Sequence, residues 1–356
     1  MSPPVVLVTG AGGYLGGLVA RRLAADGAAV VGTARSGSVE RVRRELGVPV
    51  LPADLDGDDP FAAVDGGWRR RITAVVHAAA VTRFNVDPGL AQRVNVEGTR
   101  RAVELARACP ALESFAHLST IYATGLRAGV VAERPYGDDA GFANAYERSK
   151  WAAEQLVGGA DDLPWRVLRV ATVVADDDTG SVTQYNAFHE TLKLWFYGLL
   201  SLVPGRGDTP LYFVTGGFAA DAVARLAAAA VAGGVYHVAH DRSESLTLDG
   251  LLDVAGSEFA RVEDFASRGI LRPLLADEES FELLVDGVTP FAGGLVTRAL
   301  ANVMPFARQL FVAKELDNAR LRAALAGYRA PDPAALLAAT CARLAATRWG
   351  RRLVEA

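Results

Sequence analysis

Tyr146 and Lys150 are the side chains of this sequence whose types and spacing best fit acid-base chemistry. They lie four residues apart in the segment 144–156, whose pattern predicts a helix, so both side chains project from the same face. Free tyrosine titrates near ~10, and a neighbouring ammonium favours the phenolate. The pair therefore predicts a proton donor and acceptor for a carbonyl or an alcohol. On its own, the spacing fits an exposed helical pair better, so the interpretation depends on its context.

A glycine-rich turn near the start of the chain is the second informative pattern. The apolar run Val5–Thr9 predicts a buried strand, and Gly10, Gly13 and Gly16 follow it before a helix and a further strand at residues 28–33. Glycine lets the backbone turn tightly and approach a pyrophosphate, whose charge suits a helix N-terminus. This order of elements predicts dinucleotide binding.

The end of the second predicted strand indicates which dinucleotide is bound. An NAD site typically has a carboxylate there for the ribose hydroxyls, whereas this chain has Arg35 and no acidic residue until Glu40. A guanidinium suits the 2′-phosphate of NADPH. We therefore expect NADPH in preference to NADH, and the alternative is that Arg35 is an ordinary surface arginine.

Strands and helices alternate along the first half of the chain. Apolar runs at residues 48–51, Ile72–His77, 114–118 and Trp165–Val170 predict further strands, and residues 90–108 predict a helix. This rhythm predicts an α/β fold with a Rossmann-type doubly wound parallel sheet. Its ligands should lie beyond the carboxyl ends of the strands.

Two groups of small or hydroxyl side chains follow strands of the predicted sheet. Thr120 comes after the fifth strand, so we expect it beside Tyr146, where a hydroxyl would hold the substrate oxygen. Ala78, Ala79 and Ala80 come after the fourth strand, and their small side chains would let a cofactor lie against the strand end.

The chain is predicted to have two parts. Residues 1–175 would form an NADP-binding Rossmann domain, and residues 176–356 a smaller, mostly helical substrate lobe with its clearest helices at 306–325 and 333–347. Residues 211–240 contain two short apolar runs and are expected to return to the Rossmann domain.

Residues 183–204 are dense in apolar and aromatic side chains. Such a stretch fits a core helix and also fits the wall of an apolar small-molecule pocket. A sugar buried against it would leave hydroxyls unpaired, at ~1–3 kcal/mol each, whereas an acyl chain or fused-ring body gains ~25 cal/mol per Å². If the stretch lines the site, we expect an apolar carbonyl substrate and net consumption of NADPH.

Composition argues against several classes of partner. The chain has 356 residues, 51% of them apolar, and a net charge of -4, which gives no electrostatic basis for binding nucleic acid or a membrane. Cys109 and Cys341 lie far apart, and His237 and His240 would face opposite sides of an extended run, so no metal site is expected. The isolated cysteines and the lack of a signal peptide or spanning segment predict a cytoplasmic protein.

Six motifs follow one another along the chain: Thr9-Gly10-x-x-Gly13-x-x-Gly16, Asp54-Leu55, His77-Ala-Ala-Ala80, Asn95-Val-x-Gly98-Thr99, Leu118-Ser-Thr120 and Tyr146-x-x-x-Lys150. In this order they resemble the extended short-chain dehydrogenase/reductase (SDR) superfamily, which is NAD-dependent epimerase/dehydratase-like. The resemblance covers about residues 5 to 260.

The resemblance implies a role for each matching residue. Tyr146 would be the general acid and base, Lys150 would bind the nicotinamide ribose and lower the tyrosine pKa, and Thr120 would be the hydroxyl partner, with Ser119 as the alternative. Asn95 would have either a catalytic role or a structural one that ties two elements together. The predicted NADPH contacts, with Asp54 and Leu55 at the adenine and Thr172 and Val173 at the carboxamide, are Gly10, Gly13, Tyr14, Leu15, Gly16, Arg35, Asp54, Leu55, Ala78, Ala79, Ala80, Lys150, Thr172 and Val173.

Three segments resemble the fatty-acyl reductase and thioester reductase branch of the superfamily: Leu118-Ser-Thr-Ile-Tyr122, Asn144-x-Tyr146 and Glu315-Leu-Asp317-Asn318. That branch implies that NADPH reduces an acyl group, carried on coenzyme A (CoA) or a carrier protein, to an aldehyde. The chain departs from the pattern because no carrier domain, adenylation domain or membrane segment is attached. These departures fit a free-standing enzyme that acts on a delivered substrate.

Three other functions stay open. A ketoreductase resembling hydroxysteroid dehydrogenases, acting on a polycyclic ketone, would need the same residues and an equally apolar pocket. A nucleotide-sugar epimerase or dehydratase shares the motifs, but the dehydratases that resemble this fold have an Asp-Glu pair after the threonine, where this chain has Ile121-Tyr122. A non-enzymatic NADP-binding regulator would have no need of Tyr146 and Lys150.

Overall fold

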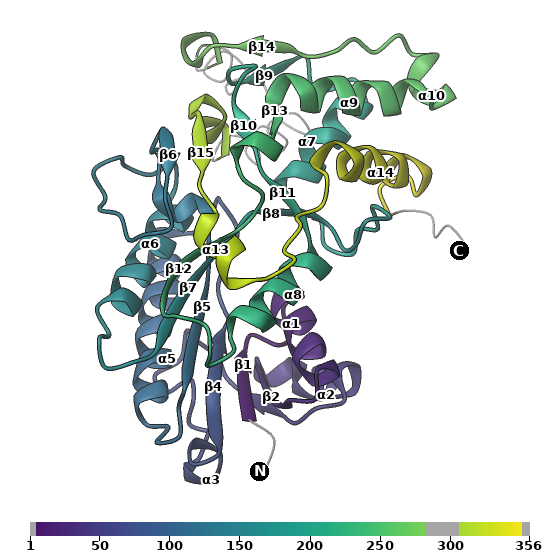
Figure 1. Ribbon diagram of the computed structural model, residues 1–356. Coiled ribbons are helices and arrows are strands. Elements are labelled where there is room, and N and C mark those ends of the chain that lie inside the picture. The colour runs from purple at the N-terminus through teal and green to yellow at the C-terminus, as the bar shows by residue number, and fades with distance from the viewer. Residues whose placement is uncertain (1–4, 282, 284–305, 351–356) are drawn as a thin grey trace.

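The larger part of the molecule is built on a seven-stranded parallel sheet, which confirms the predicted Rossmann-type fold (Figure 1). The computed structural model describes residues 5–281, 283 and 306–350. The strands of the sheet are β1 Val5–Thr9, β2 Ala29–Ala34, β3 Val50–Pro52, β4 Ile72–His77, β5 Ser114–Thr120, β7 Trp165–Val170 and β12 Gly234–Val238. Their spatial order is β12-β7-β5-β4-β1-β2-β3, and every neighbouring pair is parallel.

Helices cover both faces of this sheet because alternate side chains of each strand point to opposite sides. Val6 and Val8 of β1 share one core with three helices, α1 Tyr14–Ala25, α2 Val39–Leu46 and α8 Gly216–Leu226. Val5 and Leu7 share the other core with α5 Gly98–Arg107 and α6 Ala145–Gly158. The short helices α3 Gly66–Arg69 and α4 Pro88–Ala91 lie in the connections between these elements.

A smaller lobe with its own apolar core lies beyond the carboxyl ends of the strands (Figure 1). Its helices are α7 Ala187–Phe196, α9 Leu248–Ala260, α10 Glu263–Ala266 and α14 Pro333–Ala346. Four two-stranded pairs accompany it: β8 Thr172–Ala175 with β11 Phe213–Thr215, β9 Leu202–Pro204 with β14 Leu274–Ala276, β10 Pro210–Leu211 with β13 Leu246–Thr247, and β6 Gly129–Val131 with β15 Lys314–Leu316. No helix among the described residues is both long and apolar enough to cross a membrane.

The predicted helix over residues 306–325 is wrong. That segment consists of a 3₁₀ turn at Arg308–Phe311, the strand β15 and the short helix α13 Ala319–Ala324. The helical periodicity is overridden because β15 pairs in parallel with β6, and because Asn318 donates its side-chain N–H to the Ala239 carbonyl. The helix predicted at 333–347 is confirmed as α14, and part of the lobe predicted for 176–356 lies outside the described residues.

Two predictions in the middle of the chain need smaller corrections. The helix expected over residues 90–108 consists of α4, a π-helical segment at Gln92–Glu97 and α5. Of the chain expected to return at 211–240, β12 joins the edge of the large sheet, whereas β10 and β11 belong to two-stranded pairs.

The glycine turn after β1 has no room for side chains. Gly10 has a φ of +69°, and a Cβ on it would lie 2.7 Å from the Cα of Ala79. A Cβ on Gly16 would collide with the Gly10 carbonyl oxygen. The turn is closed by hydrogen bonds from the Gly13 N–H to Gly10 O (2.8 Å) and from the Ala11 N–H to Thr33 O (2.9 Å).

Gly16→Ala should therefore distort this turn. We expect a loss of about 1–3 kcal/mol in the free energy of unfolding, which is the usual cost of overpacking, and dinucleotide binding weakened about tenfold or more. Thermal unfolding and fluorescence titration would measure both. Gly158→Ala is the matched control, because its Cβ would meet nothing within 4 Å. Wild-type dinucleotide affinity in Gly16→Ala would contradict the idea that this turn holds the pyrophosphate.

Candidate active site

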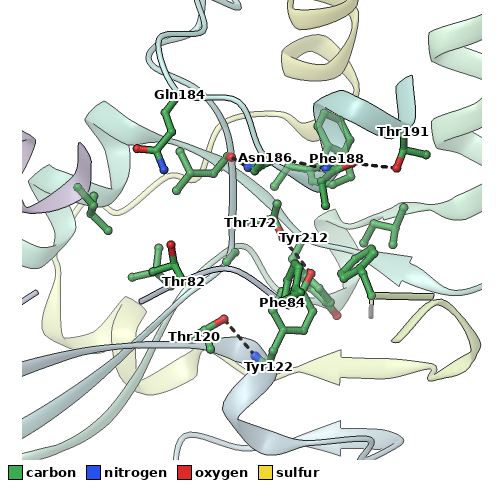
Figure 2. Close-up of a pocket in the computed structure, with 18 of the residues that line it drawn as sticks. Thr82, Phe84, Thr120, Tyr122, Thr172, Gln184, Asn186, Phe188, Thr191 and Tyr212 are labelled. Atoms are coloured by element: carbon green, nitrogen blue, oxygen red, sulfur yellow. Dashed lines mark hydrogen bonds between the residues drawn. The ribbon is translucent and has the colours of Figure 1, made fainter. Parts of the chain in front are cut away.

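A cavity of about 430 Å³ lies where the sheet meets the smaller lobe. It extends from the glycine turn, past the ends of β5 and β7, to the core of the smaller lobe. Figure 2 shows Thr120 and Tyr122 on one side of it, Asn186 and Phe188 on another, and Thr172 between them. The carboxyl ends of the strands thus open onto this space, as a parallel α/β sheet predicts.

Tyr146 lies in the first turn of α6 and faces the cavity from a buried position. Asn144 caps this helix, because its side-chain oxygen accepts a hydrogen bond from the Glu147 N–H at 3.0 Å. The Tyr146 hydroxyl is hydrogen-bonded with the Thr120 side chain. The Ser119 hydroxyl instead donates to Glu154 at 2.5 Å, so the structure brings Thr120 and not Ser119 to the tyrosine.

Lys150 lies one turn further along α6 and also lines the cavity. Its Nζ donates to the Leu118 carbonyl at 2.7 Å and lies 3.3 Å from Nε2 of His117. Burial lowers the pKa of Lys150 to about 8, and the nearby Glu154 carboxylate offsets part of this fall. The group therefore stays mostly charged at neutral pH.

The pKa of Tyr146 does not move in the direction expected from the sequence. A neighbouring ammonium was predicted to lower it, but burial holds the pKa of Tyr146 above its usual range, and the hydrogen bond with Thr120 offsets this rise only in part. Removal from water disfavours a phenolate more strongly than the local contacts favour it. At neutral pH Tyr146 therefore keeps its proton and is able to donate it.

Asn95 has the structural role that was one of its two predicted alternatives. Its side-chain oxygen accepts from the Val81 N–H at 2.8 Å, and its Nδ2 donates to Val81 O and to Ser149 Oγ, both at 2.9 Å. Ser149 in turn donates to the Tyr146 carbonyl at 2.7 Å. The loop after β4 is thus fastened to the helix that carries Tyr146.

A cluster of buried charged side chains supports the N-terminal turn of α6. The carboxylate of Glu147 accepts from the Ala143 N–H (3.0 Å) and from Gln309 Nε2 (2.9 Å). Lys314 Nζ donates to Gln309 Oε1 at 3.3 Å and to the Gly125 carbonyl at 2.8 Å. Burial raises the pKa of Glu147 and lowers the pKa of Lys314, while the charge of each residue opposes the shift of the other. This cluster connects the C-terminal part of the chain to the site.

Three aromatic rings surround the approach to Tyr146. Phe84 packs edge-on against Tyr146 and Tyr122, with ring centroids 5.5 and 5.8 Å away, and Phe306 lies 5.4 Å from Phe84. The Tyr122 hydroxyl is 2.8 Å from the hydroxyl of Thr172, a predicted carboxamide contact. The region next to Tyr146 is therefore largely apolar.

The far end of the cavity is formed by the stretch 183–204 and its neighbours. Phe188, Leu192 and Trp195 line it, and the last two also belong to the core of the smaller lobe. Trp195 is almost fully buried, and its Nε1 donates to the Leu271 carbonyl at 3.1 Å. Both interpretations of this stretch are therefore correct, because it forms part of the pocket wall and part of the core of the smaller lobe.

Charged groups are scarce around this cavity. Among the described residues that line it, Lys150 and Asp176 are the only ones with charged side chains. Asp176 accepts hydrogen bonds from Tyr14 at 2.6 Å and from Thr183 at 2.9 Å. The part of the chain that the structure describes contains no group of three or more His, Cys, Asp or Glu side chains suited to a metal.

Most of the predicted cofactor contacts come together, and four do not line the cavity. The predicted residues that line it are Gly10, Gly13, Tyr14, Leu15, Gly16, Ala78, Ala80, Lys150, Thr172 and Val173. Ala79 packs under Gly10. Arg35 and the Asp54-Leu55 pair follow β2 and β3, whose ends are joined by a hydrogen bond from the Ala53 N–H to Ala34 O at 2.8 Å.

The space around the turn after β1 suits a dinucleotide. At Gly10 and Gly16, any Cβ would meet backbone atoms, so the turn presents bare backbone beside the N-terminus of the twelve-residue helix α1. A pyrophosphate requires such a surface because its oxygens accept hydrogen bonds from backbone N–H groups. The residues of this turn therefore suit the pyrophosphate of a dinucleotide.

Several residues in or next to the site were missed by sequence reasoning. Phe84 follows β4 in a loop that has no periodicity, and Gln309 lies in the segment mistaken for a helix. Lys314 gave one signal that could have been used, because it is one of only three lysines in the chain. Asn186 gave another, since it precedes an apolar helix and caps it.

Comparisons with known proteins agree with this geometry. Residues 67–223 match a family model described as male sterility protein. A 93-residue stretch is 31% identical to an alcohol-forming fatty acyl-CoA reductase of Simmondsia chinensis, covering 25% of this chain and 19% of that protein. A 182-residue stretch is 29% identical to a dTDP-6-deoxy-L-talose 4-dehydrogenase (NAD(P)(+)) of Kitasatospora kifunensis, covering 50% and 55%. The chain thus spans about a fifth and about half of the length of these two curated relatives.

Solved structures share the fold over nearly the whole chain. The terminal R domain from the myxalamid PKS-NRPS biosynthetic pathway superposes with a TM-score of 0.77 and 20% identity, over 99% of this chain and 93% of that one. A thiolation-reductase di-domain from an archaeal non-ribosomal peptide synthetase gives 0.72 and 17%, over 98% and 76%. The family match and this shared fold confirm the predicted resemblance to the extended SDR superfamily.

Proposed function

We propose that this protein is an NADPH-dependent reductase of an apolar carbonyl substrate, preferably an acyl thioester carried on CoA or a carrier protein, which it converts to an aldehyde. The observation that carries the proposal is the cavity itself. It runs from the dinucleotide turn to the apolar core of the smaller lobe, and the proton donor Tyr146 opens onto it. In this proposal residues 1–175 hold the cofactor, together with α8 and β12, which pack with the large sheet, and the lobe within the rest of residues 176–356 covers the substrate.

The roles of the polar residues follow from their contacts. Thr120 and Tyr146, joined by a hydrogen bond, would both bind the carbonyl oxygen, and Tyr146 would donate the proton to it. Lys150 would orient the nicotinamide ribose and supply positive charge close to the phenol. NADPH supplies the hydride when bound. The thioester carbon gains the hydride and its oxygen the proton, and the thiol then leaves as the aldehyde forms.

The charge distribution favours an acyl substrate over a nucleotide sugar. A nucleoside diphosphate needs cations or several N–H donors, but Lys150 is the only cation among the described lining residues, and the cofactor needs it. The far end of the cavity would leave sugar hydroxyls unpaired, whereas an alkyl chain gains ~25 cal/mol per Å² there. The similarity to a fatty acyl-CoA reductase and to a thiolation-reductase di-domain supports this choice. A polycyclic ketone fits the same surface and is the second candidate.

The first test combines a substrate panel with Tyr146→Phe. NADPH consumption should be fastest with acyl-CoA thioesters, and removal of the acid should lower kcat/KM by ~10²–10⁴-fold with NADPH affinity nearly unchanged. Absorbance of NADPH and detection of the aldehyde would measure the two effects. If Tyr146→Phe turned over the substrate at the wild-type rate, the proposed role of Tyr146 as proton donor would be wrong. Epimerisation of a nucleotide sugar without net NADPH loss would overturn the proposed function.

Arg35 is proposed to recognise the 2′-phosphate, because it follows β2 at the surface, where no acidic side chain precedes Glu40. A charge-assisted hydrogen bond contributes ~1.5–3 kcal/mol, so Arg35→Ala should weaken NADPH binding about tenfold or more. NADH binding should not change. Arg101→Ala, an exposed arginine on α5, is the control. Equal weakening of both dinucleotides in a fluorescence titration would exclude phosphate recognition.

Phe188→Ala tests the substrate wall. Phe188 lines the cavity and is only partly buried, so its truncation should raise KM for a long acyl thioester several-fold, as expected for a lost contact of about 1–2 kcal/mol. Shorter acyl groups that do not reach this wall should be less affected. Phe142→Ala is the matched control, because Phe142 packs on Trp151, and neither ring lines the cavity. Unchanged KM values for all chain lengths would show that the acyl group lies elsewhere.

A further inference from the structure

We propose that His117 is a positioning residue for Lys150: as a neutral imidazole it accepts a hydrogen bond from the ammonium and thereby fixes its direction and its charge. This inference rests on the proposed function, in which Lys150 works with Tyr146. None of the sequence motifs includes His117 as a functional residue, and its side chain does not line the cavity.

The contacts of Lys150 with the described residues leave one of its protons free. An ammonium has three N–H bonds. One donates to the Leu118 carbonyl at 2.7 Å, and a second points to Nε2 of His117 at 3.3 Å. Both acceptors come from β5, so the strand that carries Thr120 also aims the lysine. The third N–H is left for the cofactor ribose or the phenol.

The ring of His117 is held in place from its other side. His77 pairs with His117 across β4 and β5, and the two rings stack with centroids 5.5 Å apart. Both nitrogens of His77 are engaged, Nδ1 with Thr9 Oγ1 at 2.8 Å and Nε2 with Thr99 Oγ1 at 3.1 Å. A row of polar side chains therefore runs from the start of the glycine turn, across three strands, to Lys150.

The protonation of His117 follows from its surroundings. Nε2 must carry no proton if it accepts from Lys150, so the neutral ring carries its proton on Nδ1. Nδ1 is buried and has no hydrogen-bond partner among the described residues. A phenylalanine would fill the same space without burying an unpaired polar atom, which is costly. The imidazole is therefore explained by its contact with Lys150.

The charged and titratable side chains around Lys150 decide which group changes its charge near neutral pH. From its own helix, Glu154 favours the ammonium but is paired with Arg169 of β7 at 2.6 Å and with Ser119. Burial, then the charge of Lys150, then His77 hold the pKa of His117 well below its usual value, and burial and Lys150 lower the pKa of His77 to about 3. Burial raises the pKa of Tyr146. Among Lys150, His117, His77 and Tyr146, it is therefore Lys150 that changes its charge between about pH 6 and 9.

The test uses the three lysines of the chain, which give three side-chain signals in a sample labelled with ¹³C-lysine. In the full-length protein without ligands, the Lys150 signal, identified as the one lost in Lys150→Arg, should titrate near pH 8. In His117→Phe its midpoint should fall by about one unit, because the charged form loses an acceptor. His117→Gln places an amide oxygen near the Nε2 position and should restore the midpoint. His240→Phe, another buried histidine, is the control.

Activity gives a second readout that a purely structural role would not produce. A fall of one unit from pH 8 lowers the charged fraction of Lys150 about threefold at pH 7.5 and hardly at all at pH 6. The loss of kcat/KM in His117→Phe should follow this pattern and disappear at low pH. A loss of equal size at both pH values would overturn the proposal.

Two outcomes distinguish this inference from the proposed function. The NMR titration needs no substrate, so an unchanged Lys150 midpoint in folded His117→Phe overturns the role of His117 even if thioesters are reduced. If His117→Phe does not fold, ¹⁵N-histidine NMR of the wild-type protein decides, because the proposal requires His117 to carry its proton on Nδ1. A proton on Nε2 would overturn it.

Discussion

The parallel register of the large sheet is the constraint on which the site depends. Because all seven strands run in the same direction, their carboxyl ends meet at one edge. Thr9, His77 and His117 are paired neighbours across β1, β4 and β5, and Thr120 ends β5 three residues after His117. Slipping one strand by one residue would turn each of its side chains to the opposite face. The pairing of the backbone strands thus determines how the hydroxyl, imidazole and ammonium groups lie relative to one another.

Burial of charge is the second theme of the site. Lys150, Glu147 and Lys314 all lie out of water, and each is held by hydrogen bonds to backbone or amide groups. Desolvation is the largest cause of each of their pKa shifts, ahead of any single partner. Buried charges of this kind add little net stability, but removing one partner leaves another uncompensated. The cluster therefore favours one geometry of α6 over others.

Much of the fold and part of the site could be predicted from the sequence, because the signals were local. β4 and β7 were predicted with their observed bounds, since a run of buried apolar residues has one interpretation when turns flank it. The role of Asn95 as a tie was among the predicted alternatives. The failures were non-local. Residues 306–325 were taken for a helix because their pairing partner, β6, lies far away in sequence. The direction of the Tyr146 pKa depends on burial, which spacing does not reveal.

The tie between Glu147 and the segment around Gln309 and Lys314 joins residues more than 160 positions apart. On a ribosome, the strands of the large sheet are complete once residue 238 has emerged, and an N-terminal unit of this kind tends to fold as it is made. The side chain of Glu147 then stays in water until some 70 further residues, which include its buried partners, have been synthesised. A chain that stopped before Gln309 would thus contain the complete parallel sheet but lack the contacts that Gln309 and Lys314 make with Glu147 and with Gly125.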